Sequence, residues 1–248
     1  GKASRLAKLL QRVVDAPTES AMIRRAANTS GREVDLLAEY PRSSRDVDAR
    51  AAEKTEADRA IARRFGKEFF DGDRRHGYGG FTYDPRFWQP VVPTFRDFYG
   101  LTEQSTVLDV GCAKGFMVRD FKELIPGVSV SGVDISEYAV GCADSDVHPH
   151  LQVADARCLP FDDGSFDLVV AINTIHNLDR EGVAQALGEI ERVSRRFAYV
   201  TVDAYRDEEE RQRMMKWNLT ARTILSDREW VELFEETCYT GDYYWFVP

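Results

Sequence analysis

Acidic residues and glycines recur at three points where strands of this sequence are expected to end. In the run VLDVGCAKGF, Asp109 stands two residues before Gly111, and a second glycine, Gly115, follows. Asp134 ends the run SVSGVD, and Asp155 ends the run LQVAD. Open parallel sheets bind ligands in the crevice outside the carboxyl ends of their strands. These residues therefore predict one ligand site shared by three strands.

The spacing favours a nucleoside with a cationic tail over a dinucleotide. Asp134 lies 19 residues after Gly115, where a carboxylate accepts hydrogen bonds from ribose hydroxyls. The turn reads G-x-A-x-G, whereas the turn that cradles a pyrophosphate reads G-x-G-x-x-G. Asp109 would repel a phosphate but suits an ammonium group. Asp155 is placed to accept a hydrogen bond from an exocyclic amine.

These segments resemble the class I S-adenosylmethionine-dependent methyltransferases. VLDVGCAKGF is similar to the first motif of that family, GVDIS to its second, and VADARCLPFDDGSFDLVVA to its adenine-binding and fourth-strand region. The resemblance covers residues 107–202 and implies S-adenosylmethionine as the cofactor. The segments FGKEFFDGDRRHGYGG, INTIHNL and YTGDYYWF resemble a bacterial branch associated with surface-polysaccharide gene clusters.

The resemblance implies how the turn would hold the methionine part of the cofactor. Gly111 and Gly115 would let the backbone approach it. Asp109 and the turn amides, those of Cys112 and Ala113, would lie near its ammonium and carboxylate groups. The family commonly has glycine where this chain has Ala113. The extra methyl group is tolerable if the dihedral angles of that residue are ordinary.

The resemblance also implies contacts with the rest of the cofactor. Asp134 would hold the ribose. The other expected contacts are Ile135 against the adenine, Asp155 at the adenine amine, the Ala156 amide at a ring nitrogen, and Asn173 beside the methionine tail. Independently of the resemblance, Tyr78 of the aromatic loop is a candidate to close over the cofactor.

Methyl transfer is an in-line displacement, and a hydroxyl acceptor usually also needs a base that takes its proton. His176 follows the fourth predicted strand. Histidine has an ordinary pKa of about 6.5, which suits this role. A capping or core histidine is the alternative interpretation. Asp203 and Tyr205 follow the fifth predicted strand and are candidates to contact the acceptor or to assist His176.

Alternating strand and helix patterns predict the fold. Residues 96–248 are expected to form a three-layer, doubly wound α/β domain with a mostly parallel sheet. The run DYYWFV is its last strand, and the partner of a closing antiparallel hairpin is either missing or hidden in ARTIL. Residues 66–95, rich in glycine, proline and aromatic residues, are expected to form a substrate or cofactor loop.

The first 65 residues are predicted to be a helical extension. An apolar stripe marks its first helix, a second covers Glu19–Ala27, and a third covers residues 47–65. The stripe consists of Leu6, Leu9, Leu10, Val13 and Val14. These helices are also a candidate surface for a homodimer.

The composition limits the classes of molecule that the protein is expected to bind. The net charge of −9 disfavours nucleic acid, whose binding needs a basic field. The four cysteines form no C-x-x-C pair and have no metal-like spacing from a histidine, so we expect free thiols, no metal and a cytoplasmic location. No apolar run approaches the roughly 20 residues of a membrane span, and the first residues lack the apolar core of a signal peptide.

The combined prediction is a methyltransferase that modifies oxygen or nitrogen of a small polar acceptor, such as a sugar or sugar nucleotide. The helical extension and the aromatic loop favour a small acceptor over a protein. The main alternative uses the same cofactor for non-methyl chemistry, namely cyclisation, elimination or aminocarboxypropyl transfer. A nicotinamide-dependent oxidoreductase and a non-enzymatic regulator that retains the fold are further alternatives.

Overall fold

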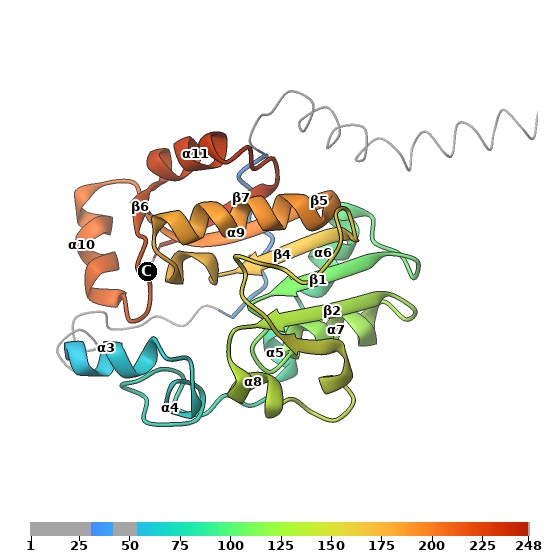
Figure 1. The fold of residues 1–248 in the computed structure, drawn as a ribbon, viewed down its shortest axis with the longest axis horizontal. Coiled ribbons are helices and arrows are strands. Elements are labelled where there is room, and N and C mark those ends of the chain that lie inside the picture. The colour runs from blue at the N-terminus through green and yellow to red at the C-terminus, as the bar shows by residue number, and fades with distance from the viewer. Residues whose placement is uncertain (1–30, 42–53, 248) are drawn as a thin grey trace, which may run out of the picture.

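Seven strands form one parallel sheet in the part of the chain that the structure describes. The computed structural model describes residues 31–41 and 54–247. The strands pair in the order β3-β2-β1-β4-β5-β6, and β7 also pairs with β5 (Figure 1). The predicted doubly wound α/β fold is confirmed. The strands are β1 Thr106–Val110, β2 Ser129–Asp134, β3 Leu151–Val153, β4 Phe166–Ile172, β5 Ser194–Tyr205, β6 Leu225–Ser226 and β7 Asp242–Phe246.

Helices cover both faces of the sheet because successive residues of each strand point to opposite sides. Val107 of β1 belongs to a core with side chains of α6, α7 and α8, whereas Leu108 belongs to a second core with α9 and α11. The helices α10, α3 and α4 lie toward the carboxyl ends of the strands (Figure 1). The helices are α3 Glu56–Ala62, α4 Lys67–Phe70, α5 Pro85–Trp88, α6 Val92–Tyr99, α7 Phe116–Leu124, α8 Glu137–Gly141, α9 Arg180–Val193, α10 Glu208–Trp217 and α11 Asp227–Glu236.

The N-terminal segment is not helical throughout, which corrects the prediction for residues 1–65. Residues 31–41 contain no helix, and Glu33 forms a parallel bridge with Tyr243 of β7. The Val34 amide donates to the Tyr243 carbonyl at 2.9 Å, so the open edge of β7 holds this segment extended. The helix α3 lies within the third predicted helix and begins with a capping box at Thr55. The first two predicted helices, and the dimer surface expected on them, lie outside the described residues.

The end of the sheet also differs from the expected antiparallel hairpin. β6 begins at Leu225, the last residue of the run ARTIL, and both β6 and β7 run parallel to β5. Helix α11 lies between β6 and β7 in the chain and leads back to the end of the sheet where the strands begin, so β7 runs in the same direction as β5. Among the described helices, none is both long and apolar enough to cross a membrane.

Asp242 ties the N-terminal segment to the sheet. Its side chain is 1% exposed and accepts hydrogen bonds from the Arg32 amide at 2.8 Å and from the Tyr99 hydroxyl at 3.1 Å. Buried hydrogen bonds to a charged group contribute about 1.5–3 kcal/mol each, and their loss leaves buried donors without a partner.

We therefore expect Asp242→Ala to lower the free energy of unfolding by about 3 kcal/mol, as measured by urea denaturation. Asp97→Ala is the control, because Asp97 pairs with Arg96 on the surface and its side chain is 69% exposed. It should change the stability little. Equal effects of the two substitutions would contradict the anchoring role of Asp242.

Candidate functional site

A cavity of about 1040 Å³ lies at the carboxyl ends of the strands. Its wall includes Val110 at the end of β1, Asp134 at the end of β2, Ile172 at the end of β4 and Asp203 near the end of β5. This is where parallel sheets of this kind bind ligands. The volume is at the upper end of the range for ligand pockets, about 300–1,000 Å³, and therefore leaves room for a cofactor and a second molecule.

The turn after β1 requires left-handed backbone at three alternate positions. Gly111 has φ of 85°, Ala113 of 50° and Gly115 of 77°. A Cβ atom on Gly111 would lie 2.1 Å from Oγ1 of Thr174, so a larger residue does not fit there. Ala113 does not meet the condition of ordinary dihedral angles, because its φ is one that residues with a Cβ atom rarely adopt.

Asp134 connects this turn to the start of α8. Its Oδ2 accepts from the Ala113 amide at 2.8 Å, and its Oδ1 accepts from the Ser136 amide at 2.8 Å. Each carboxylate oxygen retains a lone pair, so Asp134 can still accept from ribose hydroxyls. Burial raises the pKa of Asp134, and the two amide hydrogen bonds partly offset this rise.

Asp109 is a buried carboxylate without a hydrogen-bond partner among the described residues. Asp109 is only 5% exposed. Its burial, and to a smaller extent the negative charge of Asp134, raises the pKa of Asp109 to about 7. The residue is not part of the cavity wall, nor are Cys112 and Gly115. An unpaired carboxylate behind the turn fits a ligand with an ammonium group, which would act on it through charge.

The residues that were predicted to contact the adenine also line the cavity. Ile135 is 54% exposed there, although it is apolar, and it offers a surface on which a flat ring can pack. Asp155 and Ala156 line the same region. The Arg157 guanidinium binds the Asp155 carboxylate at 2.6 Å and holds its pKa below the usual range. An adenine amine would therefore share this carboxylate with Arg157.

Asn173 occupies the end of β4 in a left-handed conformation, with φ of 51°. Thr201 of β5 fixes its orientation, since the Thr201 hydroxyl donates to Oδ1 of Asn173 and accepts from its backbone amide, both at 2.9 Å. The remaining amide group of the side chain is a donor without a described acceptor. The residue lines the cavity, as expected for a contact with the methionine tail.

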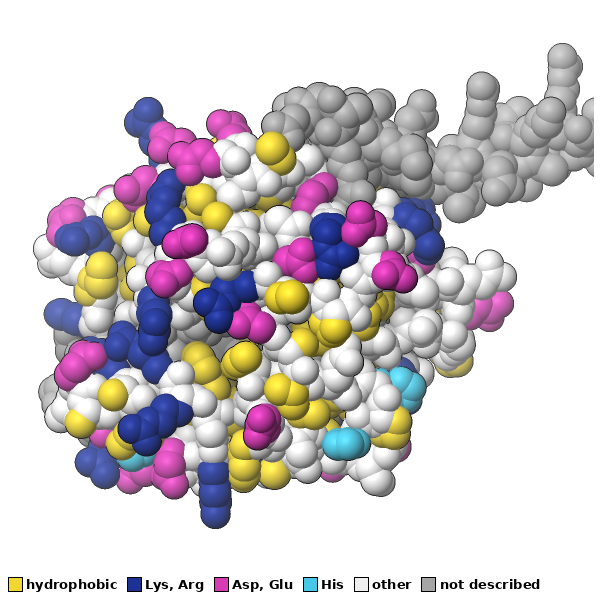
Figure 2. All heavy atoms as spheres, in the orientation of Figure 1, with side chains coloured by type: hydrophobic (Ala, Val, Ile, Leu, Met, Phe, Trp, Pro, Cys, Tyr) yellow, Lys and Arg dark blue, Asp and Glu magenta, His cyan; other side chains and the backbone are white. Residues whose placement is uncertain are grey.

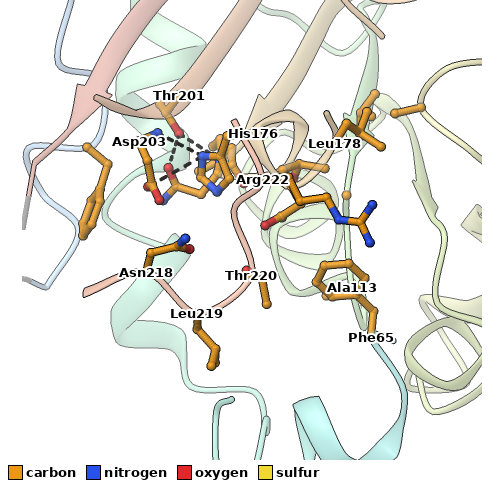
Figure 3. Close-up of a pocket in the computed structure, with 18 of the residues that line it drawn as sticks. Phe65, Ala113, His176, Leu178, Thr201, Asp203, Asn218, Leu219, Thr220 and Arg222 are labelled. Carbon is orange, nitrogen blue, oxygen red and sulfur yellow. Dashed lines mark hydrogen bonds and ion pairs between the residues drawn. The ribbon is translucent and has the colours of Figure 1, made fainter. Parts of the chain in front are cut away.

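His176 and Asp203 lie side by side in the cavity wall (Figure 3). The Asp203 backbone amide donates to Nδ1 of His176 at 2.9 Å, and one carboxylate oxygen of Asp203 lies 3.6 Å from the same nitrogen. Burial lowers the pKa of His176, so the ring is neutral at pH 7, and burial raises the pKa of Asp203.

This geometry does not support His176 as the general base. A neutral imidazole has one acceptor nitrogen, and here that nitrogen already binds a backbone amide. The ring therefore presents a donor at Nε2. Tyr205 does not line the cavity, and its hydroxyl lies 3.4 Å from the Glu229 carboxylate. Of the three predicted catalytic residues, Asp203 alone combines a free acceptor with a place in the wall.

The aromatic segment covers the cofactor end of the cavity and is fixed by a contact that the sequence did not reveal. Lys114, which is 8% exposed, binds the Asp71 carboxylate at 2.6 Å and the Phe81 carbonyl at 2.8 Å. The Tyr138 hydroxyl donates to the same carboxylate at 2.7 Å. Tyr78 lines the cavity and packs on Phe81. A lysine inside the glycine turn was the available signal for this contact.

The part of the chain that forms this sheet is similar in sequence to known proteins. Residues 107–196 match the model of a family described as "Methyltransferase domain". These residues are therefore similar to a methyltransferase domain. The ribosomal protein L11 methyltransferases of Thermotoga petrophila and Thermotoga maritima are 32% identical over 142 residues, which is 54% of this chain and 50% of each relative. The chain thus spans about half the length of these curated relatives.

Solved structures support the fold of the methyltransferase domain. YcgJ of Bacillus subtilis aligns with a TM-score of 0.50 at 21% identity and covers 59% of this chain and 66% of its own. Geranyl diphosphate C-methyltransferase of Streptomyces coelicolor, which contains S-adenosyl-L-homocysteine, aligns with a TM-score of 0.50 at 16% identity over 61% of both chains. At such identities the likeness shows the fold alone. S-adenosylmethionine, the predicted cofactor, suits the domain and the residues at its strand ends.

The conformation of Ala113 gives a stability prediction. Left-handed backbone costs a residue with a Cβ atom about 1–2 kcal/mol, so Ala113→Gly should raise the free energy of unfolding by about 1 kcal/mol. Gly100→Ala is the matched comparison, since Gly100 has φ of 63° and nothing lies within 4 Å of an added Cβ. It should lower the stability by a similar amount in the same urea titration. No gain in the Ala113 variant would contradict the assigned strain.

The pKa of Asp109 predicts how cofactor binding depends on pH. An ammonium group favours the ionised carboxylate, so binding releases a proton, and the affinity rises until pH exceeds about 7. Calorimetric titration with S-adenosylhomocysteine should show a five- to tenfold gain in affinity, roughly, between pH 6 and 7.5. Asp109→Asn should bind more weakly at pH 7.5 and lose most of this gain. An unchanged slope in that variant would assign the titration to another group.

Proposed function

We propose that the protein is an S-adenosylmethionine-dependent methyltransferase that modifies oxygen or nitrogen of a small polar acceptor. The observation that carries this proposal is one cavity that joins the cofactor end, at Ala113 and Asp134, to the Asp203–His176 pair. The family match of residues 107–196 favours methyl transfer over other chemistry on the same cofactor.

Aromatic side chains in the other part of the cavity support a sugar as acceptor. The apolar faces of sugar rings pack on such side chains, while polar groups around the ring need fixed hydrogen-bond partners. Asn218, Thr220 and Asp203 provide polar groups in the same wall. The aromatic residues of the wall outside the range 65–78 are Tyr40, Trp88, Trp217, Tyr244, Trp245 and Phe246.

Asp203 is the residue that we assign to proton removal. S-adenosylmethionine supplies an electrophilic methyl group on sulfur when it is bound. The Asp203 carboxylate would take the proton that the acceptor atom loses when it receives this methyl group and the carbon–sulfur bond breaks. His176 holds the Asp203 backbone through Nδ1, which fixes the base relative to β4.

The direct test uses S-adenosylmethionine with a labelled methyl group and a panel of sugars, sugar phosphates and nucleotide sugars. We expect S-adenosylhomocysteine to form only with a suitable acceptor, and the label to appear in that acceptor. Methylthioadenosine formed without an acceptor would instead support non-methyl chemistry. A protein that binds the cofactor and never consumes it would support a regulator.

Substitution of Asp203 tests the assigned base. Asp203→Asn should reduce kcat about 10²–10⁴-fold, because general base catalysis contributes rate factors of this size. The raised pKa of Asp203 should place the acid limb of the wild-type pH–rate profile above the range of an ordinary carboxylate, with activity increasing as pH rises. That limb should be lost in the variant.

Tyr205→Phe keeps the ring and removes only a hydroxyl that lies outside the cavity wall. We expect it to retain most of the activity, in contrast to Asp203→Asn. A large loss of kcat in Tyr205→Phe, with little loss in Asp203→Asn, would reverse the two assignments.

A further inference from the structure

Five arginines line the cavity, and three of them form ion pairs with carboxylates of the protein. Arg157 is paired with Asp155 at 2.6 Å, and Arg206 is paired with Glu210 at 2.8 Å. Arg63 pairs with Glu56 at 3.1 Å and lies two residues from Phe65, whose carbonyl accepts from Ser136 at the cofactor end. The other two are Arg213 and Arg222.

Arg213 and Arg222 have no hydrogen-bond or ion-pair acceptor for their guanidinium groups among residues 31–41 and 54–247. Figure 2 shows that Lys and Arg side chains gather on this face between α10 and α3, beside the carboxyl ends of the strands. In Figure 3 the Arg222 side chain extends away from the His176–Asp203 pair. No carboxylate of the described residues is therefore paired with either of these two guanidinium groups.

The chain segment that carries Arg222 is held in place by hydrogen bonds. Its backbone amide and that of Thr223 both donate to the His176 carbonyl at 3.0 Å. Asn218 closes the preceding loop, since its Oδ1 accepts from the Ala221 amide at 2.8 Å and its Nδ2 donates to the Ala221 carbonyl at 2.9 Å. These bonds fix the backbone between α10 and β6, so Arg222 is presented from a preorganised loop, whereas Arg213 is carried by helix α10.

The chemistry of two unpaired guanidinium groups points to a dianion. Arginine presents a planar set of donors that binds phosphate oxygens in pairs, and two such groups balance two negative charges. Besides Asp155, which is paired with Arg157, four acids of the same wall disfavour an anion next to themselves, namely Glu33, Asp134, Asp179 and Asp203. The anion and the atom that loses its proton to Asp203 must then lie at different positions of one acceptor.

We propose that the acceptor carries a phosphate or diphosphate group, which binds to Arg213 and Arg222 while the nucleophilic atom lies beside Asp203. This inference rests on the proposed function and specifies its substrate class. Among the sugar acceptors considered above, it selects sugar phosphates and nucleotide sugars over neutral sugars.

The test is a calorimetric titration of pyrophosphate into protein saturated with S-adenosylhomocysteine, so that the carboxylate of the cofactor is already in place. We expect binding by the wild type and at least tenfold weaker binding by the double variant Arg213→Gln/Arg222→Gln. The control is Arg228→Gln, because Arg228 pairs with Glu232 on α11 and its side chain is 87% exposed. It should bind pyrophosphate like the wild type.

The outcomes separate this inference from the proposed function. Equal pyrophosphate affinity in the double variant and the wild type would overturn the phosphate site. Malonate binding as tight as pyrophosphate binding would overturn the choice of phosphate over carboxylate. Binding of S-adenosylhomocysteine is measured separately, and we expect the double variant to keep it within about twofold. If the wild type fails to bind this molecule, the proposed function itself fails.

Discussion

The Asp134 carboxylate is the contact on which the cofactor end of the cavity depends. It holds the Ala113 amide and the Ser136 amide at the same distance, 2.8 Å, and thereby joins the turn after β1 to the start of α8. Burial opposes its ionisation, as its raised pKa shows, and the two amide donors compensate for part of that cost. The strained φ of Ala113 persists because its amide must point at this carboxylate.

Much of this end was predictable from the sequence because a parallel sheet brings strand ends together whatever the details of packing. The sequence pattern located β1, β2 and β3, and the acids at the ends of these strands are expected at one edge of the sheet, although Asp109 stays behind the cavity wall. Asp134 and Asp155 indeed reach the cavity wall. The argument is insensitive to side-chain conformation, since it uses only strand direction and residue order.

Features that depend on a specific contact between distant segments were beyond the sequence. Two examples are the β-bridge between Glu33 and Tyr243 and the ion pair between Lys114 and Asp71. No local sequence pattern relates the two residues of either pair. The choice between the two interpretations of His176 was beyond the sequence for a similar reason, because one hydrogen bond from the backbone of β5 decides which ring nitrogen has a free lone pair. A residue type and its place after a strand do not determine that bond.

The arrangement of charge inside the cavity also explains how an acidic protein can suit an anionic acceptor. A net charge of −9 describes the whole chain, and screening over about 8 Å at physiological salt limits what distant surface carboxylates contribute. Among the arginines of the cavity wall, Arg157 and Arg206 pair with Asp155 and Glu210, while Arg213 and Arg222 have no paired carboxylate among the described residues. The buried acids Asp109 and Asp203 suit a cationic cofactor and a proton to be removed. Opposite local charges at the two ends would therefore orient an acceptor that carries its phosphate at one end and its reactive atom at the other.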